Sequence, residues 1–551
     1  MLEGLMQNDF QLTLAHVLER MRTVNATAEV VTLTDDGKRR ATYGEVVGRV
    51  DRLAAALGGL GVRQGDRVAT FAWNTQDHLE CYLAIPCIGA VLHTLNIRLF
   101  AEQLEYIINH AKDRIVFVDD SLVPLLEQVA GKCDCVERYV VIGDGPTGTL
   151  EPVTRYEELL AGSEPLHPGD YPELSERAAS AMCYTSGTTG NPKGVLYSHR
   201  SSVLHSLATG LRDSLGVSRS DRILPVVPMF HANSWGLAYA AALFGADLVM
   251  PNRFLQAEPL VSLIESEQVT FAGAVPTIWL DVLRYANEHD SDLSSLRSVV
   301  CGGSAVPRSL MEAFEHRHGV EIVQAWGMTE TSPLGSIAHP PAGAEGEERW
   351  EYKVSAGRIA PFVEARIVGA EGEPLPRDGE TTGELEVRGP WVAAGYYEDP
   401  DGSRDRFDDG WLKTGDIASI DSEGYIRISD RSKDVIKSGG EWISSVELEN
   451  ELIGHPAVRE AAVIAMPDER WSERPLACVV LEDDGEATSA ELREHLAQRV
   501  AKWWIPDSFA FIDEVPKTSV GKFDKKVLRV RLADGELEVE RAERAERAEA
   551  S

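Results

Sequence analysis

Cysteine is scarce in this sequence, and its spacing argues against two kinds of site. The 551 residues include 7 cysteines, an odd and scattered set. No two of them form a CxxC pair, and none belongs to a Cys/His cluster at the spacing of a zinc site. The sequence therefore predicts reduced, mostly buried thiols rather than a disulfide framework or a zinc centre.

Basic side chains are in deficit. The chain has 54 Lys and Arg against 88 Asp and Glu, a formal net charge of -34. Such a surplus of negative charge repels phosphate backbones and anionic lipid headgroups. We therefore expect no nucleic-acid partner, and we interpret the acidity as a solvated surface tuned for solubility or for a salty cytoplasm.

Long apolar runs are also lacking. Residues 81–97 and 235–250 are the most apolar stretches, but Pro86 and His93 interrupt the first and Asp247 interrupts the second. A spanning helix needs ~20 apolar residues. The N-terminus has no basic segment followed by an apolar core, which a secretory signal requires. We expect a cytoplasmic protein with no integral membrane segment.

The first four hundred or so residues alternate β-branched runs with helical patterns. Examples are a strand pattern at 67–73 followed by a helical pattern at 77–88, and another pair at 270–275 and 277–288. Strands that alternate with helices imply parallel sheets covered on both faces. At ~150 residues per domain, a chain of this length is expected to contain several subdomains.

The pattern of predicted strands and helices changes twice further along the chain. After Val363, short strands separated by turns predict a small antiparallel, β-barrel-like subdomain. After Asp430, a compact α+β segment follows, and the chain ends in a short ERA repeat that offers charge without a core. The fold class is therefore α/β, with a smaller α+β part at the C-terminal end.

A loop rich in glycine and hydroxyl groups follows the apolar run at 178–183. It reads YTSGTTGNPKG, from Tyr184 to Gly194. Backbone N–H groups, hydroxyls and the ammonium group of Lys193 are suited to bind phosphate oxygens. It is not a Walker loop, because Lys193 is followed by glycine rather than by Ser or Thr. The loop predicts a phosphate-binding site of another kind.

This loop resembles the signature of the AMP-forming adenylating superfamily, which contains acyl-CoA synthetases, firefly luciferase and the adenylation domains of peptide synthetases. Segments similar to further family motifs occur at 301–307, 324–330, 411–416, 430–434 and 516–522, so the resemblance covers nearly the whole chain. It implies a large N-terminal adenylating domain at 1–429, a hinge at 430–435, a small mobile C-terminal domain at 436–535 and a charged tail at 536–551.

The resemblance implies a nucleotide site drawn from several segments. Thr329 would contact the α-phosphate, and Glu330, with Thr185, would hold Mg²⁺. Asp416 would accept hydrogen bonds from both ribose hydroxyls, which suits an acceptor-only carboxylate. The segment QAWGMTE departs from the family pattern, with Ala325 in place of the first aromatic. The full set implied for ATP or AMP is Thr185, Ser186, Gly187, Thr188, Thr189, Gly190, Gly302, Gly303, Ser304, Gln324, Ala325, Trp326, Gly327, Met328, Thr329, Asp416, Arg431, Lys433, Lys437 and Trp442.

Three further roles follow from the same resemblance. Lys522 would bridge the attacking carboxylate and the α-phosphate, with Lys193 helping to balance the charge. The segment PMFHANSWG is similar to the acyl site of fatty acyl-CoA synthetases, in which His231 lies by the carboxylate and Trp235 gates the acyl tunnel. Two glycines past the hinge allow close backbone approach to a thin pantetheine arm. The implied tunnel residues are Ser438, Gly439 and Gly440.

Together these assignments imply an ATP- and Mg²⁺-dependent acyl-CoA synthetase that forms an acyl-adenylate, releases pyrophosphate and passes the acyl group to coenzyme A. Lys522 and the pantetheine tunnel cannot easily surround one carbonyl at once, so the C-terminal domain is expected to rotate about Lys433 between the two steps. The resemblance is closest to bacterial medium- and long-chain fatty acyl-CoA synthetases. By analogy with these we expect a homodimer, and a fatty substrate leaves peripheral membrane contact open.

Several alternatives stay open at this point. The acid could instead be a small or sulfur-containing one such as methylmercaptopropionate, or the acceptor could be something other than coenzyme A. A non-catalytic binding or scaffold protein is opposed by the joint presence of Thr185, Glu330, Asp416 and Lys522. The GGS turn resembles a carrier-protein attachment serine, which its position inside the large domain argues against. Acyl chain length cannot be read from the sequence.

Overall fold

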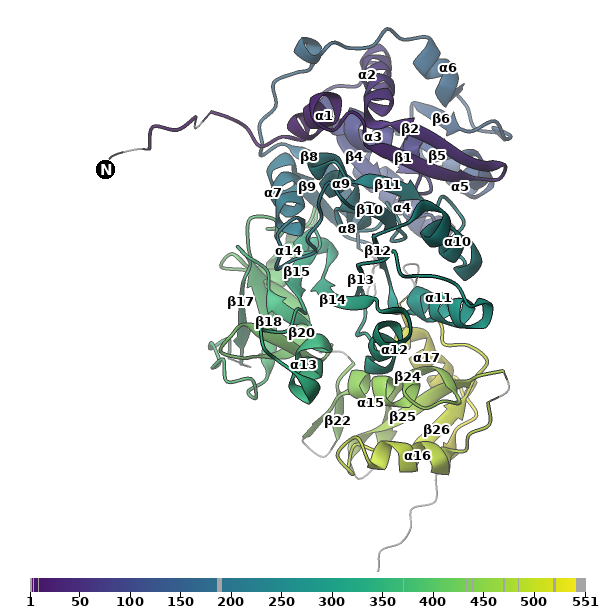
Figure 1. The fold of residues 1–551 in the computed structure, drawn as a ribbon, viewed down its shortest axis with the longest axis vertical. Helices are drawn as coiled ribbons and strands as arrows, with labels where there is room; N and C mark the ends of the chain where they lie inside the picture. Colours follow the sequence, from purple (N-terminus) through teal and green to yellow (C-terminus); the bar gives the residue numbers. More distant parts are fainter. Residues whose placement is uncertain are drawn as a thin grey trace, which may run out of the picture.

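The computed structural model describes residues 2, 4–7, 9–185, 191–369, 371–431, 434–438, 441–468, 471–483, 485–518 and 522–541. At 441 and 442 it describes the backbone alone. Figure 1 shows a large N-terminal domain with a smaller C-terminal domain below it, next to α11 (Pro276–His289) and α12 (Arg308–His318) of the large domain.

The first sheet of the large domain carries the strand that leads into the glycine-rich loop. Among the described residues it has 7 strands in the order β7-β6-β5-β3-β4-β8-β9. All neighbours are parallel except β8 and β9, which form an antiparallel pair on either side of that loop. The strands are β3 (Arg67–Phe71), β4 (Val91–Thr94), β5 (Asp113–Asp119), β6 (Arg138–Ile142), β7 (Val153–Arg155), β8 (Ala179–Tyr184) and β9 (Gly194–Ser198).

The second sheet runs from parallel to antiparallel without a break. Within the described part of the chain it has 14 strands in the order β17-β18-β20-β21-β16-β15-β14-β13-β12-β10-β11-β1-β2, with β19 paired to β20. The pairs from β1 to β14 in this order are parallel and those from β14 to β17 are antiparallel, and the edge pair of β1 and β2 is also antiparallel. The strands are β1 (Glu29–Thr34), β2 (Gly37–Thr42), β10 (Arg222–Pro225), β11 (Asp247–Met250), β12 (Phe271–Ala274), β13 (Ser298–Gly302), β14 (Glu321–Gly327), β15 (Leu334–Ile337), β16 (Gly357–Ile359), β17 (Glu364–Val368), β18 (Gly383–Arg388), β19 (Phe407–Asp408), β20 (Trp411–Ile420) and β21 (Tyr425–Arg431).

Helices cover these sheets, and one of them is buried on every side. All twelve residues of α3 (Gln76–Cys87) are buried, and the helix packs against α1, α2, β4 and β8. A helix without an exposed face belongs to the core of a large domain. The other helices of the large domain are α1 (Leu14–Thr23), α2 (Tyr43–Gly59), α4 (Ala101–Ala111), α5 (Val123–Ala130), α6 (Tyr156–Ala161), α7 (His199–Thr209), α8 (Ala232–Trp235), α9 (Leu237–Phe244), α10 (Ala257–Glu267), α13 (Gly346–Lys353) and α14 (Pro400–Arg406).

The C-terminal domain has its own sheet and its own apolar clusters. Its 6 described strands run β23-β22-β25-β26-β27, with β24 paired to β25. They are β22 (Ile436–Ser438), β23 (Glu441–Ile443), β24 (Val458–Asp468), β25 (Ser472–Leu481), β26 (Ser508–Phe511) and β27 (Glu540–Arg541), and the helices are α15 (Ser445–Ile453), α16 (Ser489–Ala497) and α17 (Lys525–Ala533).

The predicted α/β class with parallel sheets and a small second domain is confirmed. The strand and helix predicted at 67–73 and 77–88 are β3 and α3, and those predicted at 270–275 and 277–288 are β12 and α11. The antiparallel strands after Val363 continue the large sheet. The predicted hinge at 430–435 begins with the last two residues of β21, which ends at Arg431, and stops before β22, which begins at Ile436.

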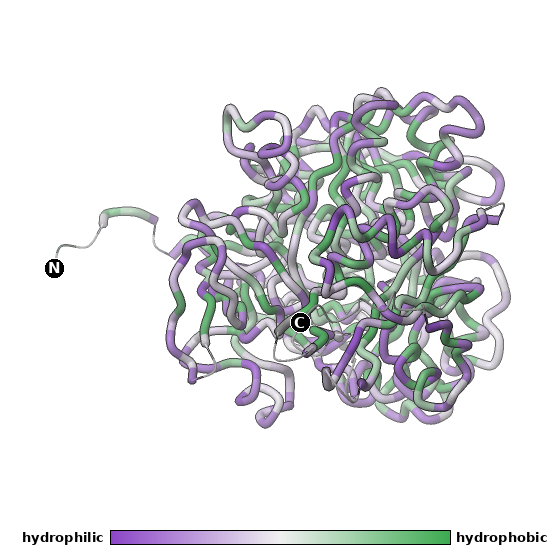
Figure 2. Tube along the Cα trace, turned by 90° about the horizontal axis from the view of Figure 1, so that it is seen from below, coloured by the Kyte–Doolittle hydropathy of each residue, from purple (hydrophilic) through white to green (hydrophobic). Residues whose placement is uncertain are grey.

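Two expectations about composition can be compared with the structure. All 7 cysteines are free thiols, and all but Cys135 are buried, as the sequence predicted. No described helix is long and apolar enough to cross a membrane. Figure 2 shows an apolar stretch in the N-terminal arm, which extends away from the body of the molecule and exposes Leu2, Leu5, Met6 and Phe10.

Candidate active site

The glycine-rich loop leaves β8 and returns as β9. At its base the Thr185 N–H donates to the Lys193 carbonyl at 2.9 Å, and the Lys193 N–H donates to the Thr185 hydroxyl at 3.2 Å. A side chain at Gly194 would lie 3.1 Å from the Tyr184 ring, so the strand needs glycine there. The predicted phosphate ligands Ser186, Gly187, Thr188, Thr189 and Gly190 lie outside the described residues.

The side chain of Lys193 lies beside an aromatic ring and a carboxylate. Its Nζ is 3.5 Å from Asp399 Oδ2 and 4.8 Å from the centre of the Tyr396 ring. The Tyr396 hydroxyl in turn donates to Glu330 Oε1 at 2.6 Å. Lys193 and the predicted metal ligand Glu330 are therefore joined through Tyr396. The sequence analysis missed Tyr396 and Asp399, because nothing in the segment GYYED distinguishes them from ordinary turn residues.

The turn after β13 approaches neighbouring backbone closely. A Cβ at Gly302 would lie 2.6 Å from the Ala325 carbonyl oxygen, and Gly303 has a φ of +90°, a conformation that favours glycine. Gln324 ties this turn down: its Oε1 accepts from the Val306 N–H at 2.6 Å and its Nε2 donates to the Ser355 carbonyl at 2.5 Å. The Gln324 amide thus binds backbone at both ends.

Asp416 is a buried carboxylate with two donors already around it. It is 2% exposed and lies opposite Arg431 in the β20–β21 pair. Arg431 Nε is 2.7 Å from Asp416 Oδ1, and the Trp326 indole N–H donates to Oδ2 at 3.0 Å. Burial raises the pKa of the Asp416 carboxyl, while the Arg431 charge opposes that shift. A polyol that donates hydrogen bonds to Asp416 would therefore share the carboxylate with Arg431 and Trp326.

Lys522 comes from the C-terminal domain to the same place. A Cβ at Gly303 would lie 3.3 Å from Lys522 Cε. Burial and the Arg431 charge lower the pKa of Lys522 to about 8, against the opposing carboxylates of Asp416 and Glu330. A lysine with this pKa is still mostly cationic at pH 7. The structure therefore puts a cation of the C-terminal domain next to the turn after β13.

His231 is the neutral member of this group. Burial first, and the Lys522 charge second, lower the pKa of His231 to about 3. An uncharged imidazole can donate or accept a hydrogen bond at neutral pH without adding charge. His231 thus offers a hydrogen-bonding group near the lysine without competing with it for an anion.

The segment that follows His231 has an unusual backbone. Ala232, Asn233, Ser234 and Trp235 all have positive φ, from 42° to 54°. Their run leads to Trp235, whose Cη2 would lie 3.5 Å from a Cβ at Gly302. A small cavity beside this segment is lined by His205, Gly236 and Tyr239, among others. The sequence analysis missed His205 and Tyr239, which reach the cavity from α7 and α9.

The remaining predicted residues have different positions. Thr329 and Glu330 are buried in a short 3₁₀ turn after β14, whereas Ser304 is exposed. Lys437 and Ser438 lie on β22, at the lower part of the C-terminal domain and away from β13 and β14 (Figure 1). Lys433, Gly439 and Gly440 lie outside the described residues, and the Trp442 side chain is not described.

Protein donors for a metal are few at this site. No group of three or more His, Cys, Asp or Glu side chains within the described ranges could hold a metal ion. The Glu330 carboxylate is 5% exposed and has a hydrogen bond from Tyr396. A single carboxylate is what Mg²⁺ uses when substrate phosphates and water supply the other oxygens. The residues present fit such an ion and not a closed metal site.

Comparison with known families and proteins gives a consistent answer. The family model described as AMP-binding enzyme matches residues 21–397, and AMP-binding enzyme C-terminal domain matches residues 447–522. A long-chain-fatty-acid–CoA ligase of Thermus thermophilus is 47% identical over 95% of this chain and 96% of its own length. A medium-chain-fatty-acid–CoA ligase of Ectopseudomonas oleovorans is 44% identical over 97% of this chain and 98% of its own.

A solved structure extends the likeness to three dimensions. An anthranilate CoA ligase in complex with anthranoyl-AMP superposes with a TM-score of 0.87 at 29% sequence identity, covering 96% of this chain and 99% of that one.

Proposed function

The chain belongs to the AMP-binding enzyme family, and on this basis we propose that it is a fatty acyl-CoA synthetase that activates a medium- or long-chain fatty acid with ATP and transfers the acyl group to coenzyme A. The main support is one arrangement: Lys522, His231, Gly303, Asp416 and Glu330 come together from two domains. The names of the similar ligases support the choice of a fatty acid.

In the first step a carboxylate oxygen attacks the α-phosphorus of ATP, the bond to the β-phosphate oxygen breaks, and pyrophosphate leaves. The attacking carboxylate and the α-phosphate are both anions, and negative charge grows between them in the transition state. A cation at the point of attack therefore lowers the barrier. Lys522 is the cation that lies by the turn after β13. His231 would orient the carboxylate through a neutral hydrogen bond, and Asp416 would hold the ribose.

Magnesium would act on the phosphate side. Glu330, with Thr185 as a second oxygen donor, is the proposed protein ligand, and Tyr396 orients the Glu330 carboxylate. A bound Mg²⁺ would neutralise charge on the triphosphate. Lys193 lies on the other side of Tyr396 and would add a further positive charge there.

In the second step the coenzyme A thiol attacks the acyl carbonyl, AMP leaves as the anion and the thiol proton is released. In this arrangement of the domains Lys522 lies beside Gly303, whereas β22, which leads to the proposed tunnel residues, pairs with β23 and β25 of its own domain. A rotation about the segment between Arg431 and Ile436 would exchange them. Ser438, Gly439 and Gly440 are the proposed tunnel residues.

One assay tests this proposal directly. Release of AMP and pyrophosphate is measured with acids from C2 to C18, together with a methylthio acid and an aromatic acid, each with and without coenzyme A. We expect the highest kcat/KM with a medium or long straight chain and multiple turnovers only with coenzyme A. A preference for the methylthio acid, coenzyme A-independent turnover, or no AMP from any acid would contradict the proposal.

The homodimer is also a proposal. The N-terminal arm exposes Leu2, Leu5 and Met6, which are 99%, 100% and 77% exposed, and a second copy of the chain is the partner that would cover them. Light scattering coupled to gel filtration should give twice the 60.4 kDa mass of the chain. A monomer at all concentrations would overturn it. Cytoplasmic location and peripheral membrane contact stay predictions.

A further inference from the structure

The chain segment that leads to His231 is fixed by a side chain from the other sheet. Asn74 lies in the loop between β3 and α3 and is 3% exposed. Its Nδ2 donates to the carbonyls of Pro225 at 2.7 Å and Val227 at 2.9 Å, and its Oδ1 accepts from the Met229 N–H at 2.7 Å. One amide therefore binds three alternate residues of the segment 225–229.

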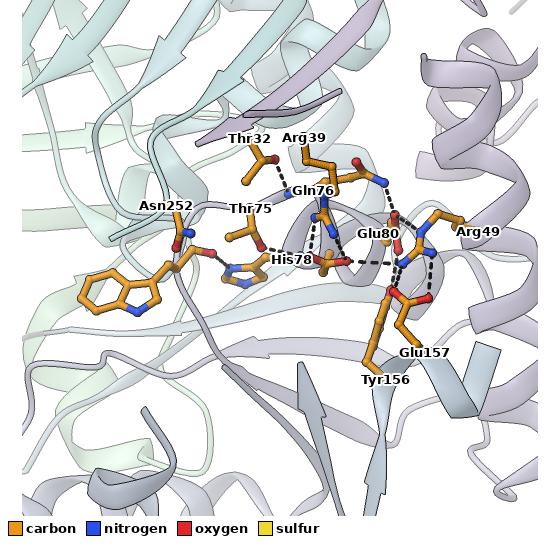
Figure 3. Close-up of polar contacts among 12 residues, drawn as sticks. Thr32, Arg39, Arg49, Thr75, Gln76, His78, Glu80, Tyr156, Glu157 and Asn252 are labelled. Atoms are coloured by element: carbon orange, nitrogen blue, oxygen red, sulfur yellow. Dashed lines mark hydrogen bonds and ion pairs between the residues drawn. The ribbon is translucent and has the colours of Figure 1, made fainter. Parts of the chain in front are cut away.

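The loop that carries Asn74 is itself rigidly placed. The His78 Nδ1–H donates to the Trp73 carbonyl at 2.9 Å, and its Nε2 accepts from the Thr70 hydroxyl at 2.9 Å. Burial lowers the pKa of His78 to about 4, so the ring stays neutral at pH 7. The Asn252 N–H donates to the Asn74 carbonyl at 3.0 Å. Figure 3 shows His78, Thr75 and Asn252 around this loop.

The helix behind the loop is anchored in the same way. Figure 3 shows Glu80 of α3 among Gln76, Arg49 and Tyr156, and all three bind its carboxylate, at 2.8, 2.7 and 2.6 Å. Glu80 is fully buried, so breaking this set would leave a buried carboxyl group without hydrogen-bond partners. The start of α3 is thus a fixed base from which Asn74 can position something else.

Asn74 positions the left-handed run, which is the set of residues 232–235 with positive φ. Left-handed residues other than glycine cost roughly 1–2 kcal/mol each and persist only where neighbours hold them. The Ser234 hydroxyl donates to the Val227 carbonyl at 2.7 Å, and this is the carbonyl that Asn74 also binds. Tyr82 donates to the Met229 carbonyl, and Cys183 to Asn233 Oδ1. The Ser234 bond joins the run to the segment that Asn74 binds, the Tyr82 bond joins that segment to α3, and the Cys183 bond joins the run to β8.

We propose that Asn74 is a positioning residue for the acid side of the active site. By binding 225–229 it fixes the left-handed run and so the places of His231 and Trp235, without touching the nucleotide residues itself. The inference rests on the proposed function and names a determinant of acid binding within it. Loss of Asn74 should therefore weaken recognition of the acid and leave recognition of ATP nearly unchanged.

The test compares Asn74→Ala with Thr75→Ala, whose neighbouring side chain caps α3 instead. Steady-state AMP release is measured with decanoate and ATP varied separately. For Asn74→Ala we expect KM for decanoate to rise about 10-fold or more and KM for ATP to change less than about 2-fold. Thr75→Ala should lower Tm and leave both KM values unchanged. An equal rise in both KM values for Asn74→Ala, or the same decanoate effect in Thr75→Ala, would overturn the proposal.

Hydrogen exchange provides a readout that does not need activity. Amides of residues 226–236 should exchange about 10-fold faster in Asn74→Ala than in the wild type or Thr75→Ala. Protection equal to wild type would refute the role of Asn74 even if no acid proved to be a substrate, whereas absence of wild-type AMP release alone counts against the proposed function. If Asn74→Ala does not fold, Ser234→Ala can replace it, because Ser234 makes the other hydrogen bond to the Val227 carbonyl. This variant should also raise KM for decanoate and leave KM for ATP nearly unchanged.

Discussion

The two halves of the candidate site are built in different ways. On the large domain, Asp416 and Gly302 belong to strands of one continuous sheet, and backbone ladders fix where they lie. On the C-terminal domain, Lys522 lies in a turn closed by its own neighbours: the Thr518 N–H donates to the Lys522 carbonyl at 2.6 Å, and the Lys522 N–H to the Thr518 hydroxyl at 3.2 Å. The sheet fixes the positions of Asp416 and Gly302, whereas the position of Lys522 depends on where the C-terminal domain lies.

This difference teaches that binding and chemistry can be disturbed separately. Changes in the sheet should act on affinity for the nucleotide, because the strands of one sheet hold that half. Changes in Lys522 or in the contacts between domains should act on one half-reaction and spare the other. The following experiments are arranged from the largest expected effect to the smallest.

Replacing Lys522 should give the largest effect. Lys522→Ala removes the cation at the point of attack, and losses of about 10²–10³-fold are usual for a group that stabilises transition-state charge. The adenylation rate, followed by pyrophosphate release, should fall by this amount. Conversion of supplied acyl-AMP to the thioester should stay within a few fold of wild type. Equal loss of both half-reactions would contradict the role given to Lys522.

Replacing Asp416 should affect nucleotide affinity. Asp416→Ala removes an acceptor for the ribose and leaves Arg431 and Trp326 without theirs. Hydrogen bonds to charged groups contribute about 1.5–3 kcal/mol, so KM for ATP should rise about 10- to 100-fold while KM for the acid changes little. Asp408→Ala, an exposed carboxylate 3.7 Å from Lys413, is the control and should leave both KM values as they are. An unchanged KM for ATP in Asp416→Ala would remove Asp416 from the site.

The pH profile should report Lys522. Its pKa is lowered to about 8, so the cation is present below pH 8 and is lost as pH rises above it. Since kcat/KM reflects the free enzyme, kcat/KM for ATP should fall above about pH 8, approaching 10-fold per pH unit. Lys522→Arg keeps its charge to much higher pH, so whatever activity it retains should show no decline there. A decline that persists in the arginine variant belongs to another group.

The contact between domains should give the smallest effect. Arg284 of α11 and Glu482 of the C-terminal domain lie 2.5 Å apart, with side chains 38% and 35% exposed. An exposed pair is worth at most about 1 kcal/mol, so Glu482→Gln should slow adenylation by no more than about 5-fold and not slow thioester formation. The control is Asp35→Asn, which breaks an exposed pair with Arg253 inside the large domain. A larger fall in thioester formation than in adenylation would reverse the assignment.

Much of this fold could be predicted from the sequence because strand and helix periods are local. The alternation at 67–88 and 270–288 gave the right elements, and the motif segments 301–307 and 324–330 lie at the ends of β13 and β14, where backbone is free to bind a ligand. What could not be predicted depends on partners far along the chain. Asn74 lies more than 150 residues from the segment that it binds, and nothing near Tyr396 indicates that it joins Lys193 to Glu330.

A motif predicts where a residue lies better than it predicts what the side chain does. Gln324 belongs to a motif segment, yet its amide holds Val306 and Ser355. The left-handed run before Gly236 has no sequence signal, since alanine, asparagine, serine and tryptophan share no preference for that conformation. Only the surrounding hydrogen bonds explain it, and these come from two sheets at once.

The continuous sheet that joins Gly302 to Asp416 fixes the distance between these two residues. The path from β13 to β20 crosses β14, β15, β16 and β21, and each step is set by the ~4.8 Å spacing of paired strands. Lengthening an outer connection such as 340–345, which follows the last residues bonded to the sheet, changes none of these steps. Such a connection is therefore where insertions and fused peptides could be accommodated while the distance between Gly302 and Asp416 stays the same.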